Sequence, residues 1–204
     1  LHHGYRSVQH VGIVSDGPVQ SVLLHSRVPL EEIEKVALLE DSLTSSMLTK
    51  IILEEFYNRR PQYRAYHLPV EQGLFLGEAA LTIGDPSYVL KHPARYVFDL
   101  GEEWRKAVGL PFVYARWLVA DHVDLDVVTP LFVEMKRRGC EQINQIVEDL
   151  SSAGEFESEI VREHLTKCVL FDVGPRELEG LEMYFNLAER VSSRAVHHTR
   201  HTHG

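Results

Sequence analysis

Four hydroxyl side chains lie within five consecutive residues of the sequence: Ser42, Thr44, Ser45 and Ser46. They stand at the start of DSLTSSMLTKIILEEFY (residues 41–57), whose apolar residues recur at helical spacing. The free N–H groups and the partial positive charge of a helix N-terminus attract a carboxylate or a phosphate, and hydroxyls add neutral donors. The stretch therefore indicates an anion-binding site, although a single Ser or Thr would also suffice as an ordinary helix cap.

Two short turn sequences are the other places where a ligand could approach the backbone. SDGPV (15–19) joins a Gly-Pro turn to Asp16, whose side chain can cap that turn. TIGDP (82–86) ends a strand at Gly84, and a glycine there lets a ligand come close to the main chain. Each of these sequences also fits a plain tight turn.

The most distinctive segment is DLGEEWRKAVGLPFVYARW (99–117), a short helix followed by a strand. Trp104 could form an aromatic wall over a ring-shaped ligand, or it could pack with Phe112 in the core. No nucleophile–base pair, metal quartet or Gly-rich nucleotide fingerprint is visible anywhere in the sequence. No catalytic residue and no metal site are therefore predicted.

These segments need a scaffold of alternating strands and helices. Strands are predicted at residues 8–14, 19–25, 36–40, 62–68, 79–84, 95–100 and 110–119. Helices or helical turns are predicted at residues 29–35, 47–56, 72–78, 101–109, 124–153, 155–166 and 175–194. The alternation predicts an α/β fold with mostly parallel sheets, in which ligands bind beyond the carboxyl ends of the strands.

Composition excludes several classes of protein. The 204 residues suffice for one large domain or two small lobes, and 44% hydrophobic with 25% charged residues is typical of a globular protein. A net charge of −9 argues against a nucleic-acid partner, and no apolar run reaches transmembrane length, which argues against a membrane protein. Cys140 and Cys168 have neither metal nor disulfide-framework spacing, so we expect buried or half-buried thiols in a reducing compartment.

The two ends of the sequence are interpreted separately from the predicted fold. The His-rich tail HHTRHTHG (197–204) is interpreted as a mobile or vector-derived terminus rather than a metal-binding tract. The first residues, LHHGYRSVQHVGIV, lack a Met and lead directly into a predicted strand. The sequence therefore reads as the middle of a longer protein.

Four motifs occur in the order that is typical of one protein family: SDGPVQSVLLHSRVPLEEI, DSLTSSMLTKIIL, IGDP and DLGEEWRKAVGLPFVYARW. They are followed later by VGPRELEGLEMYFNLAERV. On these motifs the chain resembles the chorismate dehydratase family of menaquinone biosynthesis by the futalosine pathway, over roughly residues 4–191. The resemblance implies a periplasmic-binding-protein-like α/β fold of two lobes. Lobe 1 would comprise residues 1–28 and 115–204, and lobe 2 residues 29–114.

The resemblance also implies a reaction: chorismate loses water to give 3-[(1-carboxyvinyl)oxy]benzoate. The protein would be a cytoplasmic carbon–oxygen lyase (a hydro-lyase) that acts on a small dicarboxylate without a metal or organic cofactor. Because the product is aromatic, the thermodynamic drive is large. The enzyme has mainly to orient the substrate and exclude water.

Carried over from the family's motifs, the substrate-binding residues are Ser15, Ser42, Thr44, Ser45, Ser46, Gly84, Asp85, Pro111 and Phe112. The hydroxyls would contact carboxylates, Gly84 and Asp85 would face them from a strand end, and Pro111 with Phe112 would form a wall. A related lyase of the same pathway uses a histidine base near that strand end. Residues 83–86 of this chain contain no histidine, which favours the dehydratase.

The sequence departs from the family at its beginning. Family members start with several dozen residues that include the first strands of one lobe and a proposed catalytic Asn, and no such region is present here. We therefore expect the C-terminal two-thirds of a chorismate dehydratase, which by itself can be an inactive fragment. The alternative from another class is a non-catalytic solute-binding protein for a small carboxylate metabolite.

Overall fold

The computed structural model describes residues 4–67, 69–89, 94–154 and 156–200, the last six of these by backbone only. The His-rich tail (197–204) lies wholly outside the described side chains. The strands of the described residues are β1 (Tyr5–Ser15), β2 (Val22–Ser26), β3 (Lys35–Leu39), β4 (Gln62–Tyr66), β5 (Ala79–Ile83), β6 (Tyr96–Asp99), β7 (Phe112–Ala120) and β8 (Leu170–Val173). The helical segments are η1 (Leu30–Glu32), α1 (Leu43–Ile51), η2 (Ile52–Phe56), α2 (Val70–Leu76), α3 (Pro86–Val89), α4 (Leu100–Val108), α5 (Leu125–Glu141), α6 (Ile143–Ser152), α7 (Ser158–Glu163), η3 (His164–Cys168) and α8 (Pro175–Arg200).

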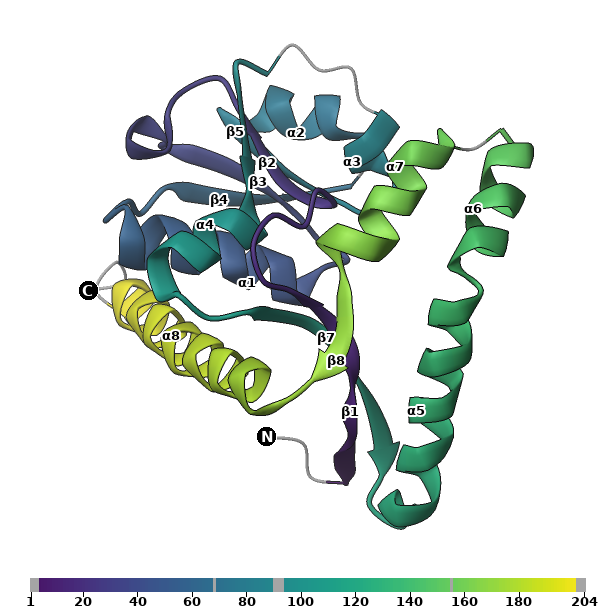
Figure 1. Ribbon diagram of the computed structural model, residues 1–204. Helices are drawn as coiled ribbons and strands as arrows, with labels where there is room; N and C mark the ends of the chain where they lie inside the picture. The colour runs from purple at the N-terminus through teal and green to yellow at the C-terminus, as the bar shows by residue number, and fades with distance from the viewer. Residues whose placement is uncertain (1–3, 68, 90–93, 155, 201–204) are drawn as a thin grey trace.

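One group of elements is built on a five-stranded sheet in the order β4-β3-β5-β2-β6. Both faces of this sheet are covered, with α2 and α3 on one side and α1 and α4 on the other (Figure 1). Side chains of a strand point alternately to its two faces. Accordingly, Val36 and Leu38 of β3 join the larger core cluster, whereas Ala37 and Leu39 pack with the α2 side.

The other group is built on a three-stranded sheet in the order β7-β1-β8, with both pairings antiparallel. The column formed by α5 and α6 stands beside β1, and α8 packs on β7 and also reaches α1 (Figure 1). No strand was predicted between the helices at residues 155–166 and 175–194, but β8 lies there. Strand β8 has only four residues, which are too few to show a clear period-2 pattern in the sequence.

The predicted two-lobed α/β fold is confirmed, but the expectation of mostly parallel sheets is wrong. Within the described residues, only the β3–β4 and β3–β5 pairs are parallel. The reason is the path of the chain, which passes from β1 into β2 and returns from β6 through α4 to β7. A strand that enters the five-stranded sheet from the junction runs away from it, so β2 is antiparallel to both β5 and β6.

The pairing of β2 also bears on the lobe boundaries. Residues 22–26 were assigned by sequence to the first lobe, but they form β2 of the five-stranded sheet. The division at residues 28 and 114 stays a prediction. The strand pairing favours a first boundary before Val22.

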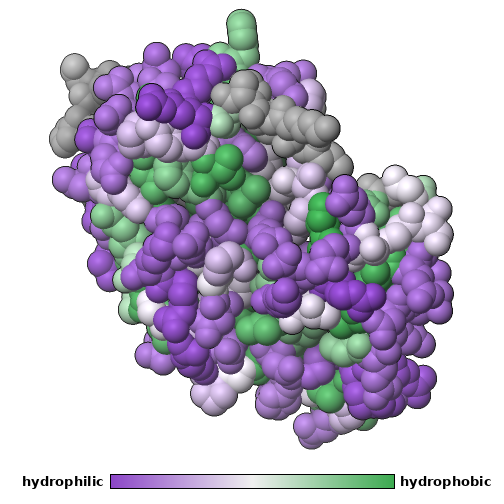
Figure 2. Space-filling view, turned by 45° about the horizontal axis from the view of Figure 1, so that its top comes forward, coloured by the Kyte–Doolittle hydropathy of each residue, from purple (hydrophilic) through white to green (hydrophobic). Residues whose placement is uncertain are grey.

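The surface shown in Figure 2 is mainly hydrophilic, and hydrophobic residues reach it in several separate patches. Cys168 is buried as expected, but Cys140 is exposed, so the expectation of a buried or half-buried thiol is wrong for Cys140. Among the described helices, none combines the length and apolar character needed to cross a membrane.

Candidate functional site

The N-terminus of α1 and the turn after β5 lie at the same edge of the five-stranded sheet. Strands β3 and β5 are parallel neighbours, with Val36 paired to Ala79 and Ala37 to Ala80. Adjacent strands are about 4.8 Å apart, so their carboxyl ends emerge side by side. The structure thus brings together two of the predicted groups, residues 42–46 and residues 84–85.

The N-terminus of α1 has no side-chain cap. Ser42 occupies the cap position, but its side chain makes no capping hydrogen bond, and the first turn carries no acidic residue. The Ser46 hydroxyl donates to the Leu39 carbonyl at 3.0 Å and so ties the helix back to β3. In the described part of the chain, the hydroxyls of Ser42, Thr44 and Ser45 have no hydrogen-bond partner. The Ser42 and Thr44 hydroxyls, on half-buried residues, are therefore free for a ligand, whereas Ser45 is without a partner but only 5% exposed.

The facing turn is shaped by Gly84. Its φ of +70° lies in the left-handed region, and a Cβ added there would meet nothing within 4 Å. The Gly84 N–H donates to the Ser21 carbonyl at 2.7 Å, which fixes the turn against the segment between β1 and β2. Asp85 follows with an exposed side chain. The turn thus offers open backbone and a carboxylate beside the α1 N-terminus.

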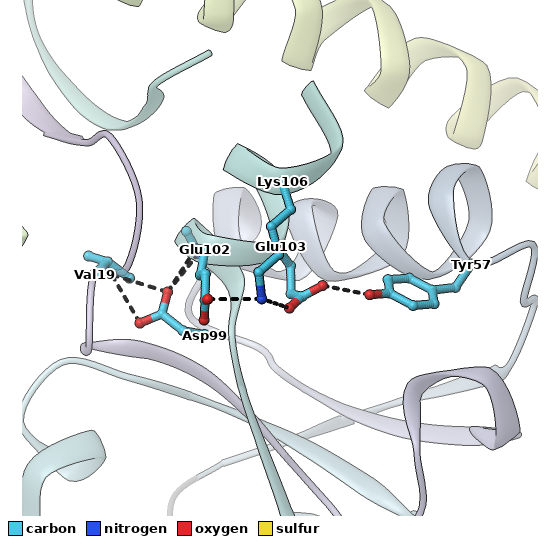
Figure 3. Close-up of polar contacts among 7 residues, drawn as sticks. Val19, Tyr57, Asp99, Glu102, Glu103 and Lys106 are labelled. Carbon is cyan, nitrogen blue, oxygen red and sulfur yellow. Dashed lines mark hydrogen bonds and ion pairs between the residues drawn. The ribbon is translucent and has the colours of Figure 1, made fainter. Parts of the chain in front are cut away.

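The segment that crosses between the two sheets is held by Asp99, at the end of β6. Its carboxylate accepts hydrogen bonds from the backbone N–H groups of Val19 and Gln20 at 2.7–3.1 Å. The same carboxylate accepts from Gly101 and Glu102 and thereby caps α4 (Figure 3). Gln20 has a φ of +60°, a conformation that costs a non-glycine residue about 1–3 kcal/mol and needs such support.

Helix α4 is braced a turn further on by a second set of contacts. The Tyr57 hydroxyl donates to Glu103 at 2.6 Å, and Lys106 contacts both Glu102 and Glu103 (Figure 3). Burial, followed by the hydrogen bond to Glu103, raises the pKa of Tyr57 to about 12. Asp16, which was interpreted as a cap of its own turn, instead accepts from Arg105 and Arg176 and links the crossing segment to α4 and α8.

Sequence reasoning missed a tyrosine–histidine pair beside the Gly84 turn. The Tyr88 hydroxyl lies 2.6 Å from Nδ1 of His164, which comes from η3, 76 residues further along the chain. Burial lowers the pKa of His164 and raises that of Tyr88. No histidine occurs at residues 83–86, but this one reaches the same strand end from a distant helix. Only the fold could reveal it, since no local motif joins the two residues.

Three predicted site residues lie elsewhere. The Ser15 hydroxyl is buried 3.1 Å from that of Tyr114. Phe112 is only 1% exposed and makes edge-on contacts with Trp104 and Tyr184. Pro111 is also buried, with its carbonyl accepting from Trp104. Such side chains offer no surface to a ligand in this conformation, so the wall predicted for Pro111 and Phe112 is core packing.

The described residues contain no group of three or more His, Cys, Asp or Glu side chains placed to hold a metal ion. The chemistry that the site offers is therefore that of hydroxyls, backbone N–H groups, one carboxylate and a Tyr–His pair. This combination suits recognition of an anionic molecule that also carries hydroxyl groups.

Comparison with known proteins adds two findings. A family model described as "Menaquinone biosynthesis" matches residues 1–190 of this chain. Among solved structures, the chain is similar to the crystal structure of protein AF1704 from Archaeoglobus fulgidus, with 16% sequence identity and a TM-score of 0.62. The similarity covers 92% of this chain and 73% of that one. At so low an identity, it shows a shared fold alone.

Proposed function

The chain belongs to the menaquinone biosynthesis family, and on that premise we propose that it is a chorismate dehydratase. The reaction removes the ring hydroxyl of chorismate, together with the proton of the neighbouring ring carbon, as water. The electron pair of the broken C–H bond becomes part of the aromatic ring of 3-[(1-carboxyvinyl)oxy]benzoate. The protein acts as a carbon–oxygen lyase on a small dicarboxylate.

The observation that supports this proposal most directly is the open N-terminus of α1. A carboxylate of the substrate accepts from the free N–H groups of the first helical turn and from the hydroxyls of Ser42, Thr44 and Ser45. Neutral donors recognise an anion without the desolvation cost of a buried cation. The first turn of α1 carries no acidic side chain that would repel a carboxylate.

The turn at Gly84 faces the same ligand from the neighbouring strand. Its positive φ and open Cβ position let the substrate ring lie close to the backbone. The exposed carboxylate of Asp85 accepts a hydrogen bond from the ring hydroxyl of chorismate and so orients the leaving group. The two carboxyl ends of β3 and β5 together hold both ends of the substrate.

The test is to incubate the purified protein with chorismate and to follow the aromatic ether by mass spectrometry. We expect chorismate to decrease as the ether appears in equal amount. A protein that binds chorismate by calorimetry but leaves it unchanged would instead be the non-catalytic carboxylate-binding protein. Unchanged chorismate without binding would exclude both activities for this chain.

A further inference from the structure

Tyr88 and His164 connect the two sheets of the molecule through a single contact. Tyr88 belongs to α3, directly after β5 of the five-stranded sheet, whereas His164 begins η3, which leads into β8 of the three-stranded sheet. Their polar atoms lie 2.6 Å apart, and their rings pack edge-on with centroids 5.5 Å apart. Phe156 packs on Tyr88 from the same side of the junction. Figure 1 shows α7, which leads into η3, beside α3.

The same two side chains hold the crossing segment between β1 and β2. The backbone of Val19 acts to raise the pKa of His164, and the side chain of Ser21 acts to lower that of Tyr88, so this segment lies close to both members of the pair. The Ser21 carbonyl in turn accepts from the Gly84 N–H at 2.7 Å and from the Ser87 hydroxyl at 3.3 Å. One compact network therefore joins the crossing segment, the Gly84 turn and η3.

We propose that Tyr88 and His164 are positioning residues that fix the Gly84–Asp85 turn relative to the three-stranded sheet. The proposal rests on the proposed function only in assuming that this turn faces the substrate. His164 restrains Tyr88, and Tyr88 restrains the turn and Ser21. Without the contact, α3 keeps its packing on Phe156, and Gly84 and Ser87 keep their hydrogen bonds to Ser21. The hydrogen bond to η3 is lost, however, and the turn is held less firmly relative to the three-stranded sheet.

The protonation states of the pair suit this role. Burial lowers the pKa of His164, although Asp85 and the Val19 backbone oppose that effect. The neutral ring therefore presents a lone pair at Nδ1 near pH 7. Burial is also the largest cause of the raised pKa of Tyr88, with Cys168, Asp99 and Asp85 adding to it. Tyr88 keeps its proton and donates a hydrogen bond to Nδ1 of the neutral His164 ring.

The experiment compares Tyr88→Phe, His164→Leu and His164→Asn with the wild-type protein by hydrogen exchange. Tyr88→Phe keeps the ring and removes only the hydroxyl, and Asn retains an acceptor near the position of Nδ1. Tyr63→Phe is the matched control, because its hydroxyl bonds to Glu54. We expect faster exchange at residues 16–24 and 80–89 in Tyr88→Phe and His164→Leu, no change there in Tyr63→Phe, and recovery in His164→Asn.

Activity provides a second readout. If the turn faces the substrate, Tyr88→Phe lowers kcat/KM for chorismate about tenfold, as expected when a positioning contact is lost. The exchange measurement needs no substrate, so it tests the contact even if the protein does not dehydrate chorismate. Unchanged exchange at both segments in Tyr88→Phe would overturn the inference, and this variant answers the question even if His164→Leu fails to fold.

Discussion

Two helices begin at the same edge of the five-stranded sheet, but only one of them has its N-terminus capped by a side chain. Helix α4 follows β6 and is capped by Asp99, whose carboxylate accepts from two N–H groups of the first turn. Its first turn also carries Glu102 and Glu103. Helix α1 follows β3 and begins with Ser42, without a side-chain cap and without an acidic residue in its first turn.

The difference separates a structural helix end from one that is free for a ligand. A carboxylate that belongs to the protein satisfies the N–H groups of α4 and occupies the place that an anion would take. At α1 the same kind of N–H groups remains unsatisfied by the described side chains, and uncharged hydroxyls surround them. A carboxylate added at the N-terminus of α1 should therefore stabilise the fold and weaken ligand binding, whereas loss of the carboxylate at the N-terminus of α4 should destabilise the fold.

The largest effect is expected for Asp99→Ala. This change removes the cap of α4 and the anchor of Val19 and Gln20, which should lower the free energy of unfolding by about 3 kcal/mol. Urea unfolding measures the loss. The matched control is Asp124→Ala, since Asp124 caps α5 through one N–H only and should cost about 1 kcal/mol. Equal losses would mean that Asp99 acts as an ordinary cap and does not anchor the crossing segment.

The second prediction makes α1 resemble α4 by placing a carboxylate at its N-terminus. Ser42→Asp should stabilise the fold by about 0.5 kcal/mol, because an acidic cap suits the helix dipole. It should also weaken chorismate binding at least tenfold, since the new carboxylate occupies the donors and repels the ligand. Calorimetry measures the affinity and urea unfolding the stability.

Ser42→Asn is the control for Ser42→Asp. It introduces a capping side chain of the same shape without a charge, so any loss of affinity should be smaller. If Ser42→Asp binds chorismate as tightly as the wild-type protein, the open end of α1 is not the carboxylate site.

A third change removes one donor and leaves the helix otherwise intact. Ser45→Ala should weaken chorismate binding about fivefold, in line with the loss of one hydrogen bond to a charged group. Stability should change by less than about 0.5 kcal/mol, because the Ser45 hydroxyl has no partner in the described residues. Ser192→Ala, on the exposed face of α8, is the control. A loss of stability without a loss of affinity would assign Ser45 to the fold.

Local sequence patterns predicted much of this scaffold. The family predicted from the motifs is confirmed at the level of menaquinone biosynthesis. The helix predicted at residues 101–109 is confirmed as α4, which ends at Val108 with Gly109 as its C-cap at a φ of +76°, a conformation that suits glycine. The Asp99 cap could also have been found, because DLGE at residues 99–102 has an acidic side chain three residues after a capping residue.

Features that depend on distant contacts could not be predicted in this way. The direction of β2 depends on its entry from the other sheet, which no periodicity reports. Phe112 has the same aromatic character in a core as in a ligand wall, and only its 1% exposure distinguishes the two. Tyr88 and His164 meet across 76 residues, so their pairing follows from the fold and not from a motif.

The smallest expected effect concerns the brace that keeps the first turns of α4 in place. Tyr57→Phe removes the hydrogen bond to Glu103, which still contacts Lys106, and should lower the free energy of unfolding by about 1 kcal/mol. The folded-state pKa of Tyr57 is raised to about 12, mainly by burial. The stabilisation is therefore fully present below pH 10 and decreases as the pH rises through 12, because the unfolded chain loses this proton first. Urea unfolding of both proteins at pH 8 and at successively higher pH should show the difference shrinking. If the difference in unfolding free energy stays constant over this range, the hydrogen bond from the Tyr57 hydroxyl does not stabilise α4. The Asp99 cap would then be the feature that distinguishes the N-terminus of α4 from that of α1.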